Sequence, residues 1–147
     1  MRRLALLVLL AACARPADPL PPSVPVRNPA APVASQANAS LARFAGDWVV
    51  VEGAGLRPGA RLRIDNGLMT VDGRPQPLSD EGTGRFRLSG DPLWVHWLDA
   101  DNRTAALGSP NGGRVWIMDR NGAPGERLRA AHEILTWYGY DLSQLER

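Results

Sequence analysis

Residues 62–71 read LRIDNGLMTV, and they carry the clearest local structural signal in this chain of 147 residues. Two short apolar runs, Leu62–Ile64 and Leu68–Val71, flank Asp65-Asn66-Gly67. Asn and Gly tolerate positive φ at both central positions of a tight turn, so Asn-Gly between two apolar runs is a strong indication of a β-hairpin. The stretch therefore predicts two antiparallel strands joined by a two-residue turn.

The same alternation of short apolar runs and turn residues continues on both sides of this hairpin. The further predicted strands are Trp48–Glu52, Pro75–Leu78, Phe86–Leu88, Leu93–Leu98, Thr104–Leu107 and Val115–Met118. Consecutive short strands with tight connections are typical of an antiparallel meander. A meander with open edges is prone to aggregate, and closure into a barrel removes those edges.

The hydrophobic period changes near the C-terminus, within residues 125–138. Apolar residues recur there at helical spacing, while Arg127, Arg129 and Glu133 lie on the other face. Gly139 is well placed to end this helix. We therefore predict an all-β domain over residues 41–147, a barrel of seven or eight antiparallel strands with one C-terminal helix packed outside it.

Residues 14–40 have a different composition, with seven Pro, seven Ala and no aromatic residue. Such a segment buries too little apolar surface to offset the entropy of ordering. The composition predicts that residues 13–40 form an extended, semi-rigid and disordered tether.

The N-terminus carries the marks of an export signal: Arg2-Arg3, an apolar run, and small residues before Cys13. The apolar run Leu4–Ala12 is too short for a spanning helix, which needs about 20 residues. Leu10-Ala11-Ala12-Cys13 matches a bacterial lipobox, which predicts a signal peptide over residues 1–12 and a covalent diacylglycerol and acyl lipid on Cys13. An ordinary secretory peptide that happens to end near a cysteine is the alternative.

The net charge and the cysteine content limit which classes of binding partner and cofactor are expected. Without Arg2 and Arg3 the chain has 15 Arg and 15 Asp plus Glu, so its net charge is zero. A neutral protein does not attract nucleic acid or acidic lipid electrostatically. Because Cys13 is the single cysteine, the domain has no thiol for a disulfide or a thiolate metal site. We expect a lipid anchor, and neither nucleic acid, metal nor a further cofactor.

Candidate binding residues come from the aromatic strands. Trp94, Trp97, Trp116 and His96 are candidates for lining an apolar pocket, although Trp on a strand is more often core. Alternation places Trp94 and His96 on one face of their strand and Trp97 on the other, and leaves open which face points inward. No nucleophile elbow occurs among the serines, so we do not expect an enzyme.

Four motifs follow one another along the globular part. They are Gly46-Asp47-Trp48, residues 98–108 (LDADNRTAALG), residues 114–120 (RVWIMDR) and residues 139–145 (GYDLSQL). Together they resemble the lipocalin family, and in particular its bacterial outer-membrane lipoprotein branch. The second motif departs from the family's Thr-Asp-Tyr type, since it keeps the acid as Asp101 alone.

This resemblance implies a lipocalin-like, eight-stranded antiparallel up-and-down barrel closed at one end by Trp48 with Arg120 lying across it. Gly46 and Asp101 complete that structural motif. It implies a binding protein, anchored in the outer membrane and facing the periplasm, that holds a small apolar or amphipathic ligand such as a fatty acid or lysophospholipid. An alternative is a filled barrel that acts as a scaffold or interaction protein of the envelope without a small ligand.

Overall fold

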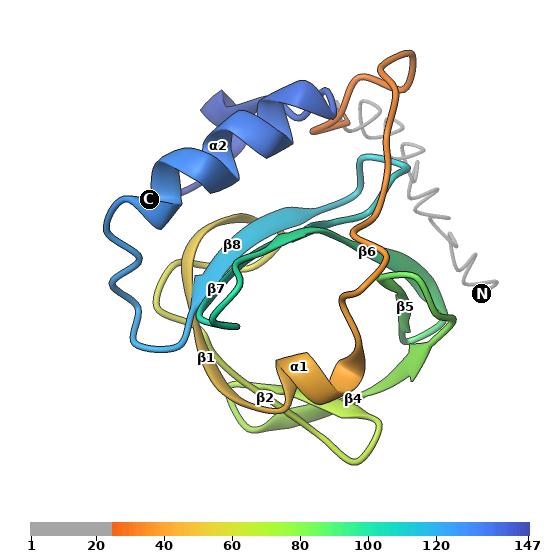
Figure 1. Ribbon diagram of the computed structural model, residues 1–147, viewed down its shortest axis with the longest axis vertical. Helices are drawn as coiled ribbons and strands as arrows, with labels where there is room; N and C mark the ends of the chain where they lie inside the picture. The colour runs from red at the N-terminus through yellow and green to blue at the C-terminus, as the bar shows by residue number, and fades with distance from the viewer. Residues whose placement is uncertain (1–24) are drawn as a thin grey trace, which may run out of the picture.

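The structure, a computed structural model, describes residues 25–147 as a closed antiparallel barrel whose strands follow in chain order, with β1 beside β8 (Figure 1). The strands are β1 (Gly46–Ala54), β2 (Arg61–Asp65), β3 (Leu68–Val71), β4 (Arg74–Asp80), β5 (Arg85–Leu88), β6 (Asp91–Leu98), β7 (Thr104–Gly108) and β8 (Val115–Asp119). The predicted eight-stranded barrel is confirmed.

The hairpin predicted from residues 62–71 forms as β2 and β3. Asp65 pairs with Leu68 across the turn, and Leu62 pairs with Val71 at its open end. Asn66 and Gly67 have φ of 48° and 72°, the left-handed conformation that a two-residue turn of this type requires. Local turn chemistry therefore sets this register.

The barrel has two distinct ends. The connections β2–β3, β4–β5 and β6–β7 lie at the end where a short helix, α1 (Leu41–Phe44), precedes β1. We call this the α1 end, and Figure 1 shows α1 lying across the ring of strands. The connections β1–β2, β3–β4, β5–β6 and β7–β8 lie at the opposite end, which we call the far end.

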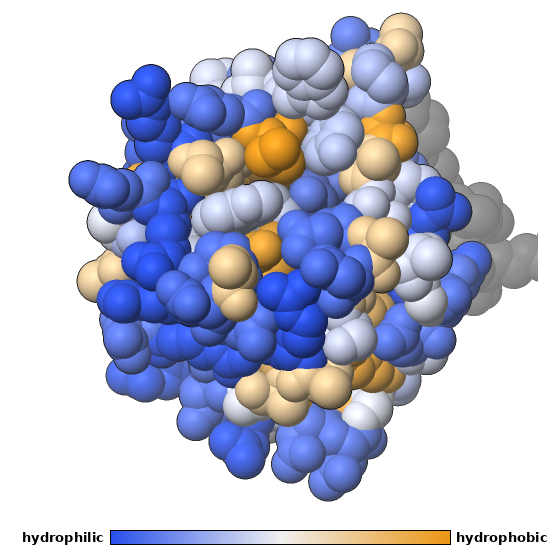
Figure 2. Space-filling model, in the orientation of Figure 1, coloured by the Kyte–Doolittle hydropathy of each residue, from blue (hydrophilic) through white to orange (hydrophobic). Residues whose placement is uncertain are grey.

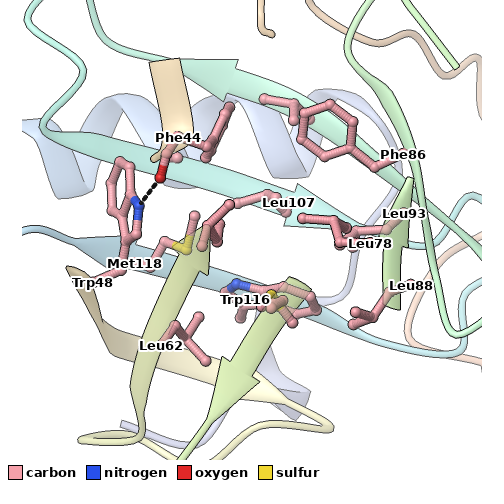
Figure 3. Close-up of a cluster of buried hydrophobic side chains, with 14 of the residues drawn as sticks. Phe44, Trp48, Leu62, Leu78, Phe86, Leu88, Leu93, Leu107, Trp116 and Met118 are labelled. Carbon is pink, nitrogen blue, oxygen red and sulfur yellow. Dashed lines mark hydrogen bonds between the residues drawn. The ribbon is translucent and has the colours of Figure 1, made fainter. Parts of the chain in front are cut away.

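Apolar side chains fill the barrel interior. Alternate residues of each strand point inward, and the largest of those that are almost fully buried include Trp48, Phe86 and Trp116, joined by Phe44 from α1. Figure 3 shows these side chains packed together with leucines and Met118. The sequence thus places bulky residues where an eight-stranded barrel is just wide enough to be filled by them.

The predicted C-terminal helix is present as α2 (Arg127–Trp137) and packs outside the barrel (Figure 1). Ala131 and Leu135 of α2 pack in a second apolar cluster with Ala106, Val115 and Ile117 of β7 and β8. Gly139 has φ of 84° directly after the helix, as a left-handed helix end requires. Among the described residues, no helix has the length and apolar character needed to cross a bilayer.

A short 3-10 helix, η1 (Leu142–Gln144), follows α2. After η1 the chain returns to β1, where Glu146 bridges Gly53. The helix α2 therefore runs along the outside of the barrel from the α1 end to the far end, because Arg127 contacts the β6–β7 turn and Tyr140 contacts Ser109 after β7.

Residues 25–40 differ from the disordered tether that their composition predicts. They form an ordered strap along the outside of the barrel, with Gln36 N–H donating to the Val95 carbonyl at 2.8 Å. The Gln36 side chain also accepts from the Leu98 amide at 2.9 Å and donates to the Leu98 carbonyl at 3.2 Å. Polar pairing with strand β6, together with burial of Val26 and Ala39 in the apolar clusters, therefore orders this Pro- and Ala-rich segment.

Arg27 holds the other end of the strap. It is only 4% exposed, and its guanidinium donates to the carbonyls of Tyr138 and Pro110 at 2.8 and 2.9 Å. From composition alone, an arginine is expected to be solvent-exposed. Here the guanidinium of Arg27 donates to three carbonyls, the third being that of Ala31 in the strap itself. Residues 13–24 of the predicted tether lie outside the described residues.

Candidate functional site

The α1 end of the barrel is closed by an arginine stacked on a tryptophan. The guanidinium carbon of Arg120 lies 3.8 Å from the centre of the Trp48 ring. Trp48 is 1% exposed, and its Nε1–H donates to the Phe44 carbonyl at 2.7 Å (Figure 3). A cation over an indole face that excludes water stabilises by up to about 2 kcal/mol. The structure thus brings together the two residues expected to close the barrel.

Arg120 also ties three chain segments together by hydrogen bonds. Its guanidinium donates to the carbonyls of Arg43, Ala45 and Asn102 at 2.9, 2.8 and 3.0 Å. Burial lowers the pKa of Arg120, while the nearby Asp47 carboxylate opposes that shift. The side chain still carries its charge at neutral pH, so these are charge-assisted bonds of a partly buried guanidinium.

Gly46 is required by this closure. Its φ is 105°, and a Cβ at this position would lie 3.2 Å from Arg120 Nη1. A side chain would therefore strain the backbone and press against the stacked guanidinium. Gly46, Trp48 and Arg120 form one structural unit, which we call the closing cluster.

Asp101 is not part of the closing cluster, contrary to the expectation from the second motif. Its side chain is exposed and contacts Arg127 at 3.4 Å. Asp99 takes the structural position instead, because its carboxylate accepts from the Arg103 and Thr104 amides at 2.6 and 2.8 Å. Burial would raise the pKa of Asp99, but these bonds and Arg127 together hold it below its usual value.

The four candidate ligand residues do not line one cavity. Trp116 points into the barrel and belongs to the interior cluster. Trp94, His96 and Trp97 lie outside it, and the β6–β7 register shifts between Val95 and Trp97. Such a bulge breaks the alternation of faces, so Trp97 lies on the outside like Trp94, and the two-face prediction for this strand is wrong at that residue.

The outward residues have structural partners. The guanidinium of Arg85 covers the Trp94 ring at 4.2 Å, and Trp97 packs against the cluster between α2 and the barrel. His96 is 3% exposed beneath the strap. These contacts stabilise the outer layer of the fold and give the three residues no access to the interior.

His96 connects the strap to the segment after α2. Its Nδ1 lies 2.8 Å from the Ala34 carbonyl, which only accepts, so Nδ1 is the protonated nitrogen. The Tyr140 hydroxyl lies 2.7 Å from Nε2 and 3.0 Å from the Ser109 carbonyl, so its single proton is shared between these two acceptors. Burial lowers the pKa of His96 from 6.5 to about 4, although the Ala34 bond opposes the shift. The ring is therefore neutral in the folded protein near pH 7.

The remaining histidine lies in a separate place. His132 Nε2 contacts the Glu52 carboxylate at 2.7 Å, between α2 and β1. Within residues 25–147, no three side chains of His, Cys, Asp or Glu gather as metal ligands would.

Trp116 has an unusual polar atom. The side chain is 0% exposed, and its Nε1–H finds no hydrogen-bond partner among the residues that the structure describes. A buried unpaired donor costs about 1–3 kcal/mol. Trp116 therefore presents an unused donor inside an apolar barrel (Figure 3).

The far end brings an arginine close to Trp116. Arg114 precedes β8, and alternation directs it to the same side of the sheet as Trp116, two residues later. Its guanidinium is half-buried and reaches the Leu88 carbonyl at 3.5 Å. Burial lowers the pKa of Arg114, and the charge of Asp91 opposes this. A shallow hollow beside it is lined by Asp91, Ser109, Asn111, Gly113 and Arg114.

Sequence reasoning missed Phe44, Arg43 and Arg114. Phe44 and Arg43 sit on the four-residue helix α1, where no apolar period is long enough to be read. Arg43 donates to Asn102 Oδ1 at 2.7 Å and so supports the same turn as Arg120. Strand alternation, which places Trp116 in the interior, also places Arg114 on the inner side. This pattern could have identified Arg114 from the sequence.

Comparisons with known proteins identify the fold. No protein-family model matches this chain, and no curated protein sequence matches it. Among solved structures the chain is similar to insecticyanin from the tobacco hornworm Manduca sexta, a lipocalin, with a TM-score of 0.55 and 14% sequence identity over 79% of this chain and 84% of insecticyanin. At this identity the similarity shows the lipocalin fold alone, and membership of the bacterial lipoprotein branch stays a prediction.

Replacing Trp48 with alanine tests the closing cluster. The substitution removes a buried indole and leaves a cavity under Arg120, so the free energy of unfolding is expected to fall by about 3–5 kcal/mol and the melting temperature by several degrees. The exposed Trp137 is the matched control, since Trp137→Ala is expected to change stability by no more than about 0.5 kcal/mol. An unchanged thermal midpoint for Trp48→Ala contradicts this role.

Acid titration tests the burial of His96. Its pKa is lower in the folded than in the unfolded chain, so the unfolded state takes up the proton first as pH falls. The stabilising contribution is complete above pH 6.5 and is lost as the pH falls toward about 4, a total of about 3 kcal/mol.

The measurement is urea unfolding of the wild type and His96→Gln between pH 7 and pH 4, the pH range that covers the pKa shift of His96. The variant should lose part of the pH dependence, while His132→Gln, as the control, should keep the part that His96 contributes. Equal slopes for the wild type and His96→Gln contradict the assignment.

Proposed function

We propose that this protein is a lipid-anchored, lipocalin-like lipoprotein of the bacterial cell envelope that binds one small amphipathic ligand in its barrel. The lipocalin fold is typically a binding fold rather than a catalytic one. The ligand class is a fatty acid or a lysophospholipid, and the anchor is the lipid on Cys13. The proposed location is the periplasmic face of the outer membrane. The observation that carries the binding proposal is the buried, unpaired Nε1–H of Trp116.

The far end offers the polar groups that such a ligand needs. Arg114 supplies a half-buried positive charge and Trp116 a neutral donor, two residues apart on the same side of β8. A carboxylate or phosphate bound there pairs with the guanidinium and accepts the indole proton. Without a ligand, Arg114 has one long hydrogen bond and the Nε1–H of Trp116 has none among the described residues. The ligand's head group supplies both residues with a charged acceptor.

The ligand's acyl chain then enters the interior from the far end. Leu56, on the β1–β2 connection, packs against the interior cluster from this end, and Met69 and Met118 lie within that cluster. Methionine side chains are flexible and adapt to a new neighbour, so displacement of Leu56 and rearrangement of the methionines make room. Each buried methylene contributes about 0.8 kcal/mol.

A filled barrel without a small ligand is the second candidate. It is favoured by the packing of the interior, where the large side chains of Trp48, Phe86 and Trp116 are at most 1% exposed. In that case the outer surface contacts a protein of the envelope and the interior serves stability alone.

Binding of palmitate separates the two candidates. Native mass spectrometry of delipidated protein is expected to show one palmitate per chain, and Trp fluorescence to follow the titration. Arg114→Gln is expected to raise the Kd about tenfold or more through loss of a charged hydrogen bond, and Trp116→Phe to raise it a few-fold.

Two controls accompany this measurement. Arg74→Gln removes an exposed arginine at the same end and is expected to leave the Kd unchanged. Hexadecanol, which has no carboxylate, is expected to bind Arg114→Gln and the wild type equally. If no fatty acid or lysophospholipid forms a stoichiometric complex, the binding proposal fails and the filled barrel stands.

Metabolic labelling with palmitate tests the anchor. Cys13, which lies outside the described residues, is expected to carry the label in cells, and the label is expected to disappear in Cys13→Ala. A wild-type protein that takes up no label contradicts the anchor. It leaves the palmitate-binding test unaffected, because that test measures only ligand binding by the barrel.

A further inference from the structure

One large apolar side chain stands out on the surface at the far end. Of the described residues, two large hydrophobic side chains are exposed, Leu68 at 41% and Trp137 at 75%. Leu68 lies in the β2–β3 hairpin at the α1 end, whereas Trp137 is the last residue of α2. On the face seen from the α1 end, hydrophobic residues form only small groups among hydrophilic ones (Figure 2).

The strap joins the fold beside Trp137. Val26 N–H donates to the Gly112 carbonyl on the β7–β8 connection at 3.0 Å, and Asn28 N–H donates to the Gly139 carbonyl at 2.8 Å. A Cβ on Gly139 would lie 2.5 Å from the Ala31 Cβ, so the strap is in close contact with the segment that follows Trp137. The described part of the chain therefore begins at the far end, next to the end of α2.

The position of Cys13 in the sequence limits how far the bilayer can be from Trp137. Cys13 precedes Pro25, the first described residue, by twelve positions. Twelve residues span at most about 40 Å when fully extended. A lipid on Cys13 thus keeps the membrane surface within about 40 Å of the far end, and it raises the effective concentration of the membrane at any contact residue there.

Tryptophan has the chemistry for such a contact. Its ring is large and apolar and its Nε1–H is polar, which is why Trp concentrates at the boundary between acyl chains and headgroups. The chain after Arg3 has no net charge, so it has no net electrostatic attraction to an anionic bilayer. An exposed indole beside the tether supplies an orienting contact.

We propose that Trp137 inserts into the headgroup boundary of the bilayer that holds the Cys13 lipid and turns the far end of the barrel toward that bilayer. The inference rests on the lipid anchor proposed above. It places Arg114 and Leu56 at the membrane side of the protein, so that an amphipathic ligand passes between the bilayer and the barrel without crossing bulk water.

Quenching by brominated lipid tests this contact. The full chain is coupled through the thiol of Cys13 to a maleimide-bearing phosphatidylethanolamine in phosphatidylcholine vesicles, with brominated phosphatidylcholine as the quencher. Wild-type Trp fluorescence is expected to be quenched, and Trp137→Phe is expected to abolish that quenching. Because Trp137 is a surface residue, its replacement leaves the melting temperature unchanged, which is checked on the same samples.

Trp94→Phe is the matched control, since Trp94 is half-buried under the guanidinium of Arg85. This variant is expected to be quenched like the wild type. Wild type and Trp137→Phe with equal quenching, or with none, overturn the proposal. The chemical coupling does not depend on natural acylation, so failure of palmitate labelling contradicts the anchor, and failure of quenching contradicts the docking of Trp137 alone.

Discussion

The stacking of Arg120 on Trp48 is the contact on which the α1 end of the barrel depends. The guanidinium lies 3.8 Å from the ring and is bonded to the Arg43 and Asn102 carbonyls, so one side chain joins α1, β8 and the β6–β7 turn. Arg120 is 77 residues from Arg43 and 18 residues from Asn102 in the chain, so tertiary folding brings these segments together. Because this end is closed by the stacked, charge-assisted cluster, the proposed route of a ligand into the interior starts at the far end.

The strap links this closed barrel to the proposed anchor. Its backbone and the Gln36 side chain pair with β6, and Arg27 satisfies carbonyls near the far end. The proposed membrane contact of Trp137, the ligand groups Arg114 and Trp116 and the entrance of the strap all lie toward the same end. The fold therefore separates a stability function at the α1 end from a proposed exchange function at the far end.

The strands, their turns and the C-terminal helix could be predicted because they depend on residues near one another in the sequence. Asn66-Gly67 sets its hairpin by φ alone, and Gly139 ends α2 in the same way. The site was predictable in part. Trp48 and Arg120 came from motif resemblance, and Trp116 came from its place on an apolar strand. Asp101 and Trp97 were misplaced, since a turn hydrogen-bond pattern and a bulge in β6 between Val95 and Trp97 decide their positions.

By itself the sequence determined the order, number and direction of the strands, because alternation and turn chemistry act over a few residues. The tertiary structure decided what those strands enclose and what lies on them. Whether a Pro- and Ala-rich segment is ordered depends on carbonyls and amides of β6, which composition does not describe. Whether an indole N–H is paired depends on the neighbours that barrel closure brings to it, and for Trp116 closure brings no acceptor from the described residues within hydrogen-bond distance.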